Sequence, residues 1–306
     1  MSHACRICLK PVRERDYHVA CLRALFGVAR VPQLDISLAK LHTAGLAMVG
    51  RSSLSGVQKK ISVTLTTDRE TLQVAADGGR YILKPQTETF PALPENEHVT
   101  TCLAKLVEIE LAPFGLVALR DGSPAFISRR FDRLPDGRKL RQEDFCQLAE
   151  QSPKDKYDGS AELCVRLLRN YASEPLIETL KFYRLLLFAW WTGNGDVHLK
   201  NLSLFTDTHG IMRLTPACDL VSTRLVIPDD PLALPVLGRT SKLTRKTWLE
   251  FAEYCAIPKK TAQRVLEKQA LVEGAARAAI DACFLPAEQK VALKGLLAER
   301  GAALRD

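Results

Sequence analysis

The residues best suited to chemistry lie in one short loop, Gly193 to Asn201, which follows a very apolar run. Asp196, His198, Lys200 and Asn201 lie within this loop. A carboxylate can accept the proton of an attacking hydroxyl, and an amide oxygen can bind a hard cation such as Mg²⁺. The apolar run from Phe182 to Trp190 predicts a buried helix, and Leu202 to Phe205 predicts a strand. Two rigid elements would therefore hold the loop.

The spacing within this region narrows the chemistry. Asp196 and Asn201 are five positions apart, as are the Asp and Asn of the protein-kinase catalytic loop, where the Asp accepts the hydroxyl proton and the Asn holds magnesium. Asp219 stands where a second, carboxylate ligand would be expected. Because magnesium is commonly held by one or two carboxylates with phosphate oxygens and water, Asn201, Asp219 and a nucleotide would suffice. The plainer alternative is that Asp196 caps a turn and Asp219 ends a strand.

A lysine at a strand end is the next candidate. Tyr81-Ile-Leu-Lys84 has the pattern of the kinase strand whose lysine pairs with the α- and β-phosphates of ATP. A helix is predicted from Pro94 onward, and either Glu95 or Glu97 in its first turn could orient Lys84. The Ser/Gly stretch from Gly50 to Lys60 is a weak phosphate-loop signal, because a hairpin turn would look the same.

The rest of the chain divides into a strand-rich part and a mainly helical part. We expect a linker helix over 34–47, a strand over 61–65, and a two-stranded ribbon from 71–75 and 81–84 around Asp77-Gly-Gly. Strands are also expected over 115–119 and 124–129, and helices from Gln142 and over 247–254, 260–271, 275–283 and 286–298. The predicted division is a segment 1–27, an N-lobe 28–131 and a helical C-lobe 132–306.

The first 27 residues contain a second group of metal-binding side-chain types. Cys5 and Cys8 are separated by two residues, and so are His18 and Cys21. Pairs at this spacing can offer four soft ligands to a tetrahedral zinc ion. The gap between the pairs matches no common zinc finger, and reduced thiols on a small amphipathic segment are the alternative.

Composition sets broader limits. With 306 residues, 46% of them hydrophobic, the chain can bury the core of one large or two moderate domains. No apolar run reaches the roughly 18 residues of a membrane span, and the first residues lack the features of a signal peptide, so we expect a cytoplasmic protein. The net charge of +8 favours a polyanionic partner, which could be nucleic acid, ATP or an acidic protein surface. Six scattered cysteines are expected to be buried, reduced thiols: Cys102, Cys146, Cys164, Cys218, Cys255 and Cys283.

Six motifs, in order, resemble those of the HipA toxin kinases. They are Ser-Gly-Val-Gln-Lys-Lys at 55–60, Tyr-Ile-Leu-Lys-Pro at 81–85, Arg-Arg-Phe-Asp-Arg at 129–133, Gln-Glu-Asp-Phe-Cys-Gln at 142–147, Gly-Asn-Gly-Asp-Val-His-Leu-Lys-Asn at 193–201 and Pro-Ala-Cys-Asp-Leu-Val-Ser at 216–222. The resemblance implies an α+β, two-lobed, protein-kinase-like fold with a β-rich N-lobe and a mainly α-helical C-lobe. The short N-terminus most resembles the compact HipT branch, in which a separate small HipS-like protein supplies a missing subdomain.

The same resemblance implies a serine/threonine kinase toxin of a type II toxin–antitoxin system. Relatives phosphorylate a protein substrate, an aminoacyl-tRNA synthetase, and halt translation; a helix-turn-helix antitoxin is the implied partner, with DNA contacted only through it and no membrane involved. By resemblance Asp196 is the proton acceptor, and Asn201 and Asp219 hold Mg²⁺. The implied ATP-binding residues are Ser55, Gly56, Val57, Gln58, Lys59, Lys60, Lys84, Arg129, Arg130, Phe131, His198, Lys200, Asn201 and Asp219. Ser53 and Ser55 fall where the family autophosphorylates, and a phosphate there would repel the ATP phosphates.

Four features depart from the HipA pattern. The hinge begins with Arg129 where HipA has an acidic residue, and Cys218 replaces a tyrosine. Ser55 is HipT-like and absent from HipA, and the Cys/His cluster lies outside the HipA core. Two other functions therefore stay open: a catalytically silent, ATP-binding co-repressor acting with a DNA-binding antitoxin, and a nucleic-acid adaptor at the Cys/His end. The adaptor would show binding that weakens steeply with salt. The complete set of Lys84, Asp196, Asn201 and Asp219 favours the kinase.

Overall fold

A computed structural model describes residues 3–13, 15–34, 36–39, 59–75, 78–134 and 136–305. Two compact units share the chain. The first contains Met1–Cys102, Ala112–Arg138 and Ala279–Pro286, and the second contains Leu103–Leu111, Lys139–Ala278 and Ala287–Asp306. Among the described residues, no helix combines the length and apolar character that crossing a bilayer requires. The predicted α+β class is confirmed.

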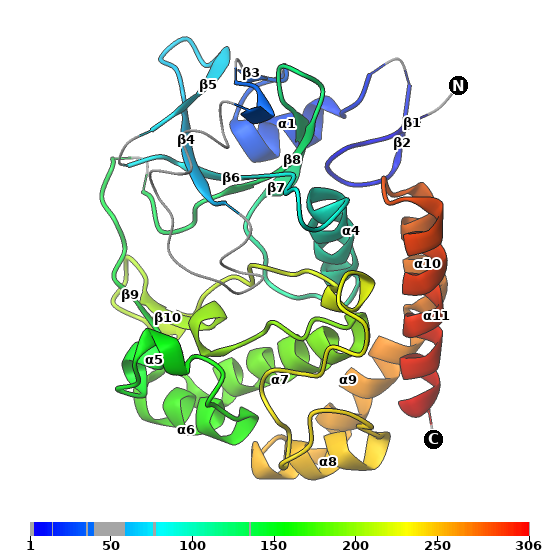
Figure 1. Ribbon diagram of the computed structural model, residues 1–306. Coiled ribbons are helices and arrows are strands. Elements are labelled where there is room, and N and C mark those ends of the chain that lie inside the picture. Colours follow the sequence, from blue (N-terminus) through cyan, green and yellow to red (C-terminus); the bar gives the residue numbers. More distant parts are fainter. Residues whose placement is uncertain are drawn as a thin grey trace. The chain divides into compact units, whose positions relative to one another are not determined.

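The first unit is built on a six-stranded sheet (Figure 1) in the order β3-β5-β4-β6-β8-β7. Its strands are β3 (Gln33–Leu34), β4 (Ile61–Leu65), β5 (Thr71–Val74), β6 (Tyr81–Pro85), β7 (Phe114–Ala118) and β8 (Pro124–Arg129). Only the β3–β5 pair is parallel. Every strand predicted in this part of the sequence is present, because each is a short β-branched or aromatic run bounded by polar turns.

The predicted ribbon between residues 71–75 and 81–84 is wrong, since β4 lies between those two strands. Val63 pairs with Val74 on one side of β4 and with Tyr81 on the other. The connection from β5 to β6 must therefore pass β4. Gly79 permits this, because a Cβ on this residue would overlap with the Ser62 side chain and approach the Val63 backbone to 3.0 Å. Asp77 of the predicted turn lies outside the described residues.

The N-terminal segment completes the core of this sheet. It consists of β1 (His3–Ala4), β2 (Pro11–Val12) and α1 (Val19–Phe26), which ends at Gly27. Leu22, Leu25 and Phe26 of α1 belong to the same buried cluster as Ile61, Val63, Tyr81 and Leu83 of the sheet. Residues 1–27 therefore contribute to the N-lobe core and do not form a separate body.

The expected linker helix from Leu34 is wrong at its start. Leu34 lies in β3, is buried, and pairs in parallel register with Leu72. Burying the Leu34 side chain in the sheet core outweighs the helical periodicity that suggested a linker. Residues 40–47 of the expected helix lie outside the described residues.

Helix α4 (Leu93–Leu106), predicted from Pro94, is present, and most of it belongs to the first unit. The second unit is mainly helical: α5 (Phe145–Leu148), α6 (Ala161–Tyr171), α7 (Pro175–Thr192), α8 (Arg245–Tyr254), α9 (Lys259–Leu271), α10 (Glu273–Ala282) and α11 (Ala287–Ala303). The end of α10 belongs to the first unit. Short 3₁₀ helices occur at Pro153–Asp155, Leu199–Asn201 and Thr223–Leu225.

Helix α7 is the buried helix that the apolar run predicted. Its last eleven residues, from Phe182 to Thr192, are buried apart from Arg184 at its half-buried position. The Trp191 indole N–H donates to the Leu297 carbonyl of α11 at 3.2 Å, and Tyr183 packs edge-on against Trp248 of α8. The loop that follows α7 therefore starts from a helix enclosed within its unit.

A small antiparallel sheet, β11-β10-β9, holds the other side of that loop. Its strands are β9 (Gln142–Asp144), β10 (Ser203–Thr206) and β11 (Met212–Leu214). The helix expected from Gln142 starts only at Phe145, because residues 142–144 pair with β10. Asp144 then caps the helix: it accepts from the Gln147 N–H, and the Gln147 side chain accepts from the Asp144 N–H.

None of the nine cysteines forms a disulfide. Five of the six expected to be buried are buried, but Cys218 is exposed. Cys218 sits in the loop after β11 and directly before Asp219, so its side chain is not part of an apolar face.

Candidate active site

The loop after α7 begins with a left-handed residue. Gly193 has a φ of 70°, and its N–H returns to the Trp190 carbonyl at 3.1 Å. A glycine is favoured here because it adopts positive φ without a Cβ penalty. It also has little room for a side chain, because a Cβ would overlap with Leu296 and crowd Arg224. The buried helix thus ends at a defined residue, and Asp196 follows three positions later.

Two asparagines fix the shape of the loop. The Asn194 side chain accepts from the Asp196 N–H at 3.1 Å and donates to the Asp219 carbonyl at 3.1 Å. The Asn201 amide donates from Nδ2 to the Asp196 carbonyl at 2.9 Å. Asn194 therefore ties the loop that carries Asp196 to the segment that carries Asp219, and Asn201 closes the loop on itself. Because Nδ2 makes this bond, Oδ1 is the Asn201 atom suited to a cation.

A buried polar cluster supports the loop from below. The Gly195 N–H donates to Thr223 Oγ1 at 2.8 Å, and the Thr223 hydroxyl also contacts the Asp230 carboxyl. A Cβ at Gly195 would overlap with that carboxyl, so the second glycine provides the space for Asp230. The pKa of Asp230 is raised above its usual value, mainly by burial and also by the charge of Asp196. The hydrogen bond from Thr223 acts in the opposite direction.

The Asp196 side chain points into a small polar group. Tyr157 donates its hydroxyl to Asp196 Oδ1 at 2.6 Å, and His198 Nε2 lies 3.9 Å from the same oxygen. The Tyr157 and His198 rings meet edge-on at 5.0 Å. Asp196 is 13% exposed and His198 is 1% exposed. A carboxylate that is oriented by neighbours and still reaches solvent is suited to accept a proton.

The two predicted magnesium ligands lie at the same end of one hairpin. Asn201 lies just before β10, separated from it by Leu202, and Asp219 follows β11. These strands pair antiparallel with Leu204 opposite Leu214. The Thr215 N–H then donates to the Ser203 carbonyl at 2.9 Å, which continues the pairing toward both residues. Asp219 has a φ of 54°, a conformation that aspartate tolerates better than most residues. The hairpin and the Asn194 bridge together position Asp219 relative to the loop.

Lys84 lies in the first unit, at the penultimate position of β6. Its ammonium group forms a buried ion pair with Glu97 of α4, and the two side chains are 5% and 2% exposed. The same group lies 5.6 Å from the centre of the Phe126 ring. Of the two candidate partners, Glu97 therefore pairs with Lys84. Burial raises the pKa of the other, Glu95.

One predicted hinge residue, Arg130, pairs with a buried aspartate, Asp132. Arg130 forms two bonds to Asp132, from Nε at 2.9 Å and from Nη2 at 2.7 Å, and Arg133 adds a third at 3.1 Å. The backbone of Arg129 and Arg130 continues the sheet by donating to the Pro113 and Arg80 carbonyls. Arg130 is therefore oriented by the Asp132 carboxylate, and Phe131 is half-buried between them in sequence.

Other predicted site residues have separate surroundings. Lys200 is exposed and forms an ion pair with Asp144 at 3.0 Å. Lys59 and Lys60 precede β4, whereas Ser53, Ser55, Gly56, Val57 and Gln58 lie outside the described residues. The four candidate zinc ligands come together in the first unit.

Sequence reasoning missed four residues of the site: Asn194, Tyr157, Thr223 and Asp230. Asn194 carried a usable signal, because it lies between two glycines within the loop itself. Tyr157 is 39 positions from Asp196, and Asp230 lies in a proline-rich stretch, so neither belongs to a local pattern.

The fold is that of protein kinases. HipA of Shewanella oneidensis MR-1, in its complex with HipB and operator DNA, matches with a TM-score of 0.68 and 22% sequence identity over 82% of this chain and 64% of that chain. The Helicobacter pylori proinflammatory kinase CtkA matches with a TM-score of 0.55 and 13% identity over 80% of this chain and 94% of that chain. The predicted two-lobed, kinase-like fold is confirmed.

Residues 52–277 match the HipA-like C-terminal domain, and the chain belongs to this family. Two proteins of Sinorhizobium fredii, named "Putative kinase Y4mE" and "Putative kinase Y4dM", are 31% and 32% identical over 68% and 67% of this chain. A Haemophilus influenzae protein named "Putative kinase" is 28% identical over 77% of this chain and 74% of its own length. The chain spans about half the length of the two Sinorhizobium relatives, 51% and 53%.

The pairing of Asp132 with Arg130 and Arg133 predicts how the stability of the protein depends on pH. Although burial raises it, the hydrogen bond and charge of Arg130 bring the pKa of Asp132 below its usual value. A lowered folded-state pKa contributes stability that is present above the unfolded pKa of about 4 and is lost as the pH falls below it. We expect Asp132→Asn to lower the free energy of unfolding by about 1–3 kcal/mol at pH 7 and by progressively less below pH ~4. Urea denaturation across this range measures the difference.

The matched control is Asp136→Asn, which removes a carboxylate whose ion pair with Arg138 is exposed. It should change the unfolding free energy much less than Asp132→Asn at every pH. An Asp132→Asn effect that is equal at pH 7 and pH 3 would contradict a charged role for Asp132.

Proposed function

We propose that this chain is an ATP- and Mg²⁺-dependent serine/threonine protein kinase and the toxin of a HipA-type toxin–antitoxin system. The observation that carries the proposal is the loop in which Asn194 and Asn201 hold Asp196 beside the segment bearing Asp219. Membership of the HipA-like family and the kinase fold support the same conclusion.

The proposed reaction transfers the γ-phosphoryl group to a substrate hydroxyl. The hydroxyl oxygen forms a bond to the γ-phosphorus, the bond from that phosphorus to the bridging oxygen of ADP breaks, and the hydroxyl proton passes to Asp196. Tyr157 holds Asp196 Oδ1 in place. His198 is buried, which favours a role in positioning Asp196 over direct contact with the nucleotide.

Asn201 Oδ1 and the Asp219 carboxylate would hold the magnesium ion, since hard oxygen donors suit this cation. Bound magnesium would neutralise charge on the ATP phosphates. Lys84 is proposed to contact the α- and β-phosphates, and its pairing with Glu97 would keep the ammonium group in one orientation. The Ser/Gly stretch at 55–60, Arg129, Phe131 and Lys200 remain proposed nucleotide contacts.

The biological partners follow from relatives. HipA of Shewanella oneidensis MR-1 has been solved with HipB and operator DNA. We propose by analogy a DNA-binding antitoxin partner for this chain, with DNA contacted through that partner. The proposed substrate is an aminoacyl-tRNA synthetase, whose phosphorylation would stop translation.

Replacing the proton acceptor tests the kinase assignment. We expect Asp196→Asn to reduce phosphoryl transfer by about 10²–10⁴-fold, because the amide cannot accept the hydroxyl proton. The measurement is transfer of labelled γ-phosphate to protein, alongside thermal unfolding to establish that the variant is folded. Asp229→Asn is the matched control, since Asp229 is 90% exposed and pairs only with Arg224 among the described contacts of its carboxylate. Undiminished transfer by Asp196→Asn would remove the kinase assignment, and a wild type that binds ATP without any transfer would favour the silent co-repressor.

Autophosphorylation is proposed at Ser53 or Ser55. A phosphate in this stretch would add nearly two negative charges and oppose binding of the ATP phosphates. Mass spectrometry of the wild type incubated with ATP should find phosphate on one or both serines, and none on either in Asp196→Asn. Ser52→Ala serves as the control and should leave phosphorylation unchanged, while Ser53→Ala with Ser55→Ala should abolish it. Phosphate found only at other residues would contradict the proposal.

A further inference from the structure

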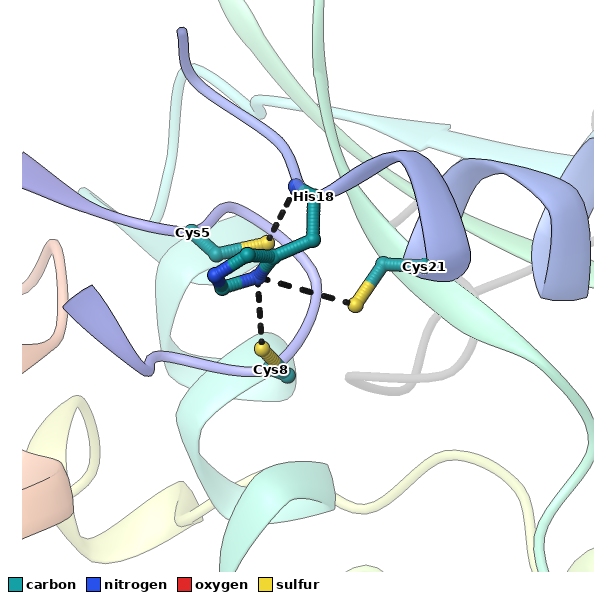
Figure 2. Close-up of side chains that lie close together, drawn as sticks. All are labelled: Cys5, Cys8, His18 and Cys21. Atoms are coloured by element: carbon teal, nitrogen blue, oxygen red, sulfur yellow. Dashed lines mark hydrogen bonds between the residues drawn. The ribbon is translucent and has the colours of Figure 1, made fainter. Parts of the chain in front are cut away.

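A cluster of three cysteines and one histidine in the first unit has no part in the proposed kinase reaction. Figure 2 shows Cys5, Cys8, His18 and Cys21 pointing toward one another, with Cys21 extending from the first turn of α1. One ligand atom from each lies within 4.8 Å of all the others. Cys5 is buried and the other three residues are half-buried. We propose that these four residues bind a structural zinc ion.

The distances suit a tetrahedral ion. Zinc lies about 2.3 Å from sulfur and about 2.0–2.1 Å from nitrogen, so the ligand atoms of a tetrahedral site are about 3.5–3.8 Å apart. His18 Nδ1 lies 3.4 Å from Cys8 Sγ and 3.9 Å from Cys21 Sγ. Small side-chain rotations would bring all four ligand atoms to these spacings. Four protein ligands fill a tetrahedral shell, which is typical of a structural and not a catalytic zinc site.

The histidine tautomer is set by the backbone. His18 Nε2 lies 3.0 Å from the Pro11 carbonyl. A carbonyl oxygen can only accept, so Nε2 carries the hydrogen and Nδ1 of the neutral ring has a lone pair. Nδ1 is the nitrogen that faces the two sulfurs. A carbonyl that fixes the ring in this way is a common feature of zinc-binding histidines.

The backbone around Cys5 and Cys8 forms a tight turn of the kind that holds a pair of zinc ligands. The Leu9 N–H donates to the Cys5 carbonyl at 2.9 Å, which closes a tight turn around the first pair, and the His18 N–H donates to Cys5 Sγ at 3.5 Å. Leu9, directly after Cys8, has a φ of 60°, a conformation that a bulky residue rarely adopts. The turn is therefore held in a strained form that presents both sulfurs to one point.

The other cysteines give the contrast. Cys164 and Cys255 are buried singly, as expected for cysteines that act as small apolar side chains. Within the part of the chain that the structure describes, Cys5, Cys8, His18 and Cys21 form the one group of three or more such side chains close enough to hold an ion. Apolar packing does not require three thiols to converge on a histidine nitrogen, whereas these four residues must converge in this way to bind one metal ion.

Zinc would stabilise the segment that carries its ligands, residues 5–21, and this segment contacts both the sheet and α4. The Leu116 N–H of β7 donates to the Arg6 carbonyl at 2.8 Å, and the Tyr17 hydroxyl donates to the Leu116 carbonyl at 2.9 Å. Cys102 of α4 contacts the Ile7 carbonyl at 3.6 Å. Residues between and beside the ligands thus contact both the sheet and the helix that carries Glu97. Metal loss should therefore release this segment and destabilise the first unit.

The test begins with the metal content of the purified full-length chain. We expect about one zinc per chain in the wild type by elemental analysis, and X-ray absorption should show three sulfur ligands and one nitrogen ligand. Cys5→Ala with Cys8→Ala should reduce zinc to less than about a tenth of an equivalent, because two ligands are lost. The matched control is Cys164→Ala with Cys255→Ala, which removes the same number of thiols and should keep the full equivalent.

A second readout does not depend on the folding of a variant. Cobalt exchanged into the wild type should give thiolate-to-metal charge-transfer bands, and a strong chelator should remove zinc and lower the unfolding temperature. Hydrogen exchange should then increase at residues 4–18 and β7. Wild-type chain purified without zinc, iron with sulfide in its place, or full zinc retention in the Cys5/Cys8 variant would each overturn the proposal. The zinc proposal does not depend on the kinase assignment, because metal content and spectra are read without ATP.

Discussion

The candidate active site depends on one side chain, Asn194, that joins two segments through both ends of its amide. It accepts from the N–H of Asp196 and donates to the carbonyl of Asp219. This bridge joins the proposed proton acceptor to the proposed metal ligand, in addition to the contacts that Tyr157 and Thr223 make with the loop. Asn194 itself is buried and placed by Gly193, which ends a helix enclosed in its unit. A buried apolar helix thus leads directly into a loop whose polar groups are held in fixed positions.

The two units support function by the same means, which is to bury a polar group together with its partner. In the first unit, the buried Lys84 pairs with Glu97, and the buried Asp132 pairs with Arg130 and Arg133. In the second, Thr223 and Asp230 lie under the loop glycines. An unpaired charge in such places would be costly, so each pair constrains the other's position. The proposed phosphoryl transfer would rely mainly on positioning and charge, and constraints of this kind would suit it.

Many features of the fold and of the candidate site could be predicted from the sequence where the residues involved are close along the chain. The apolar run before Gly193 is a local pattern, and it predicted the buried helix α7. The cysteine pairs are also local, and the structure brings the four predicted zinc ligands together. The spacing of Asp196 and Asn201 is local too, and the roles that it suggests stay predictions. Contacts between residues far apart along the chain could not be predicted from the sequence. The insertion of β4 between β5 and β6, and the contact of Tyr157 with Asp196, depend on tertiary packing. The choice between Glu95 and Glu97 also needed the structure, because residues two apart on a helix face nearly opposite sides and the sequence did not fix which side faced Lys84.

Measurements of ATP affinity can distinguish the proposed metal ligands, Asn201 and Asp219, from the proposed proton acceptor, Asp196. Calorimetric titration of Mg²⁺-ATP into the wild type and three variants measures the affinity of each complex. If Asp219 and Asn201 hold the metal and Asp196 accepts the proton, Asp219→Asn and Asn201→Ala should each weaken binding by about tenfold or more, about 1.4 kcal/mol. Asp196→Asn should bind Mg²⁺-ATP about as tightly as the wild type. Equal binding by Asp219→Asn and the wild type, or a loss with Asp196→Asn as large as with Asp219→Asn, would contradict the assignment.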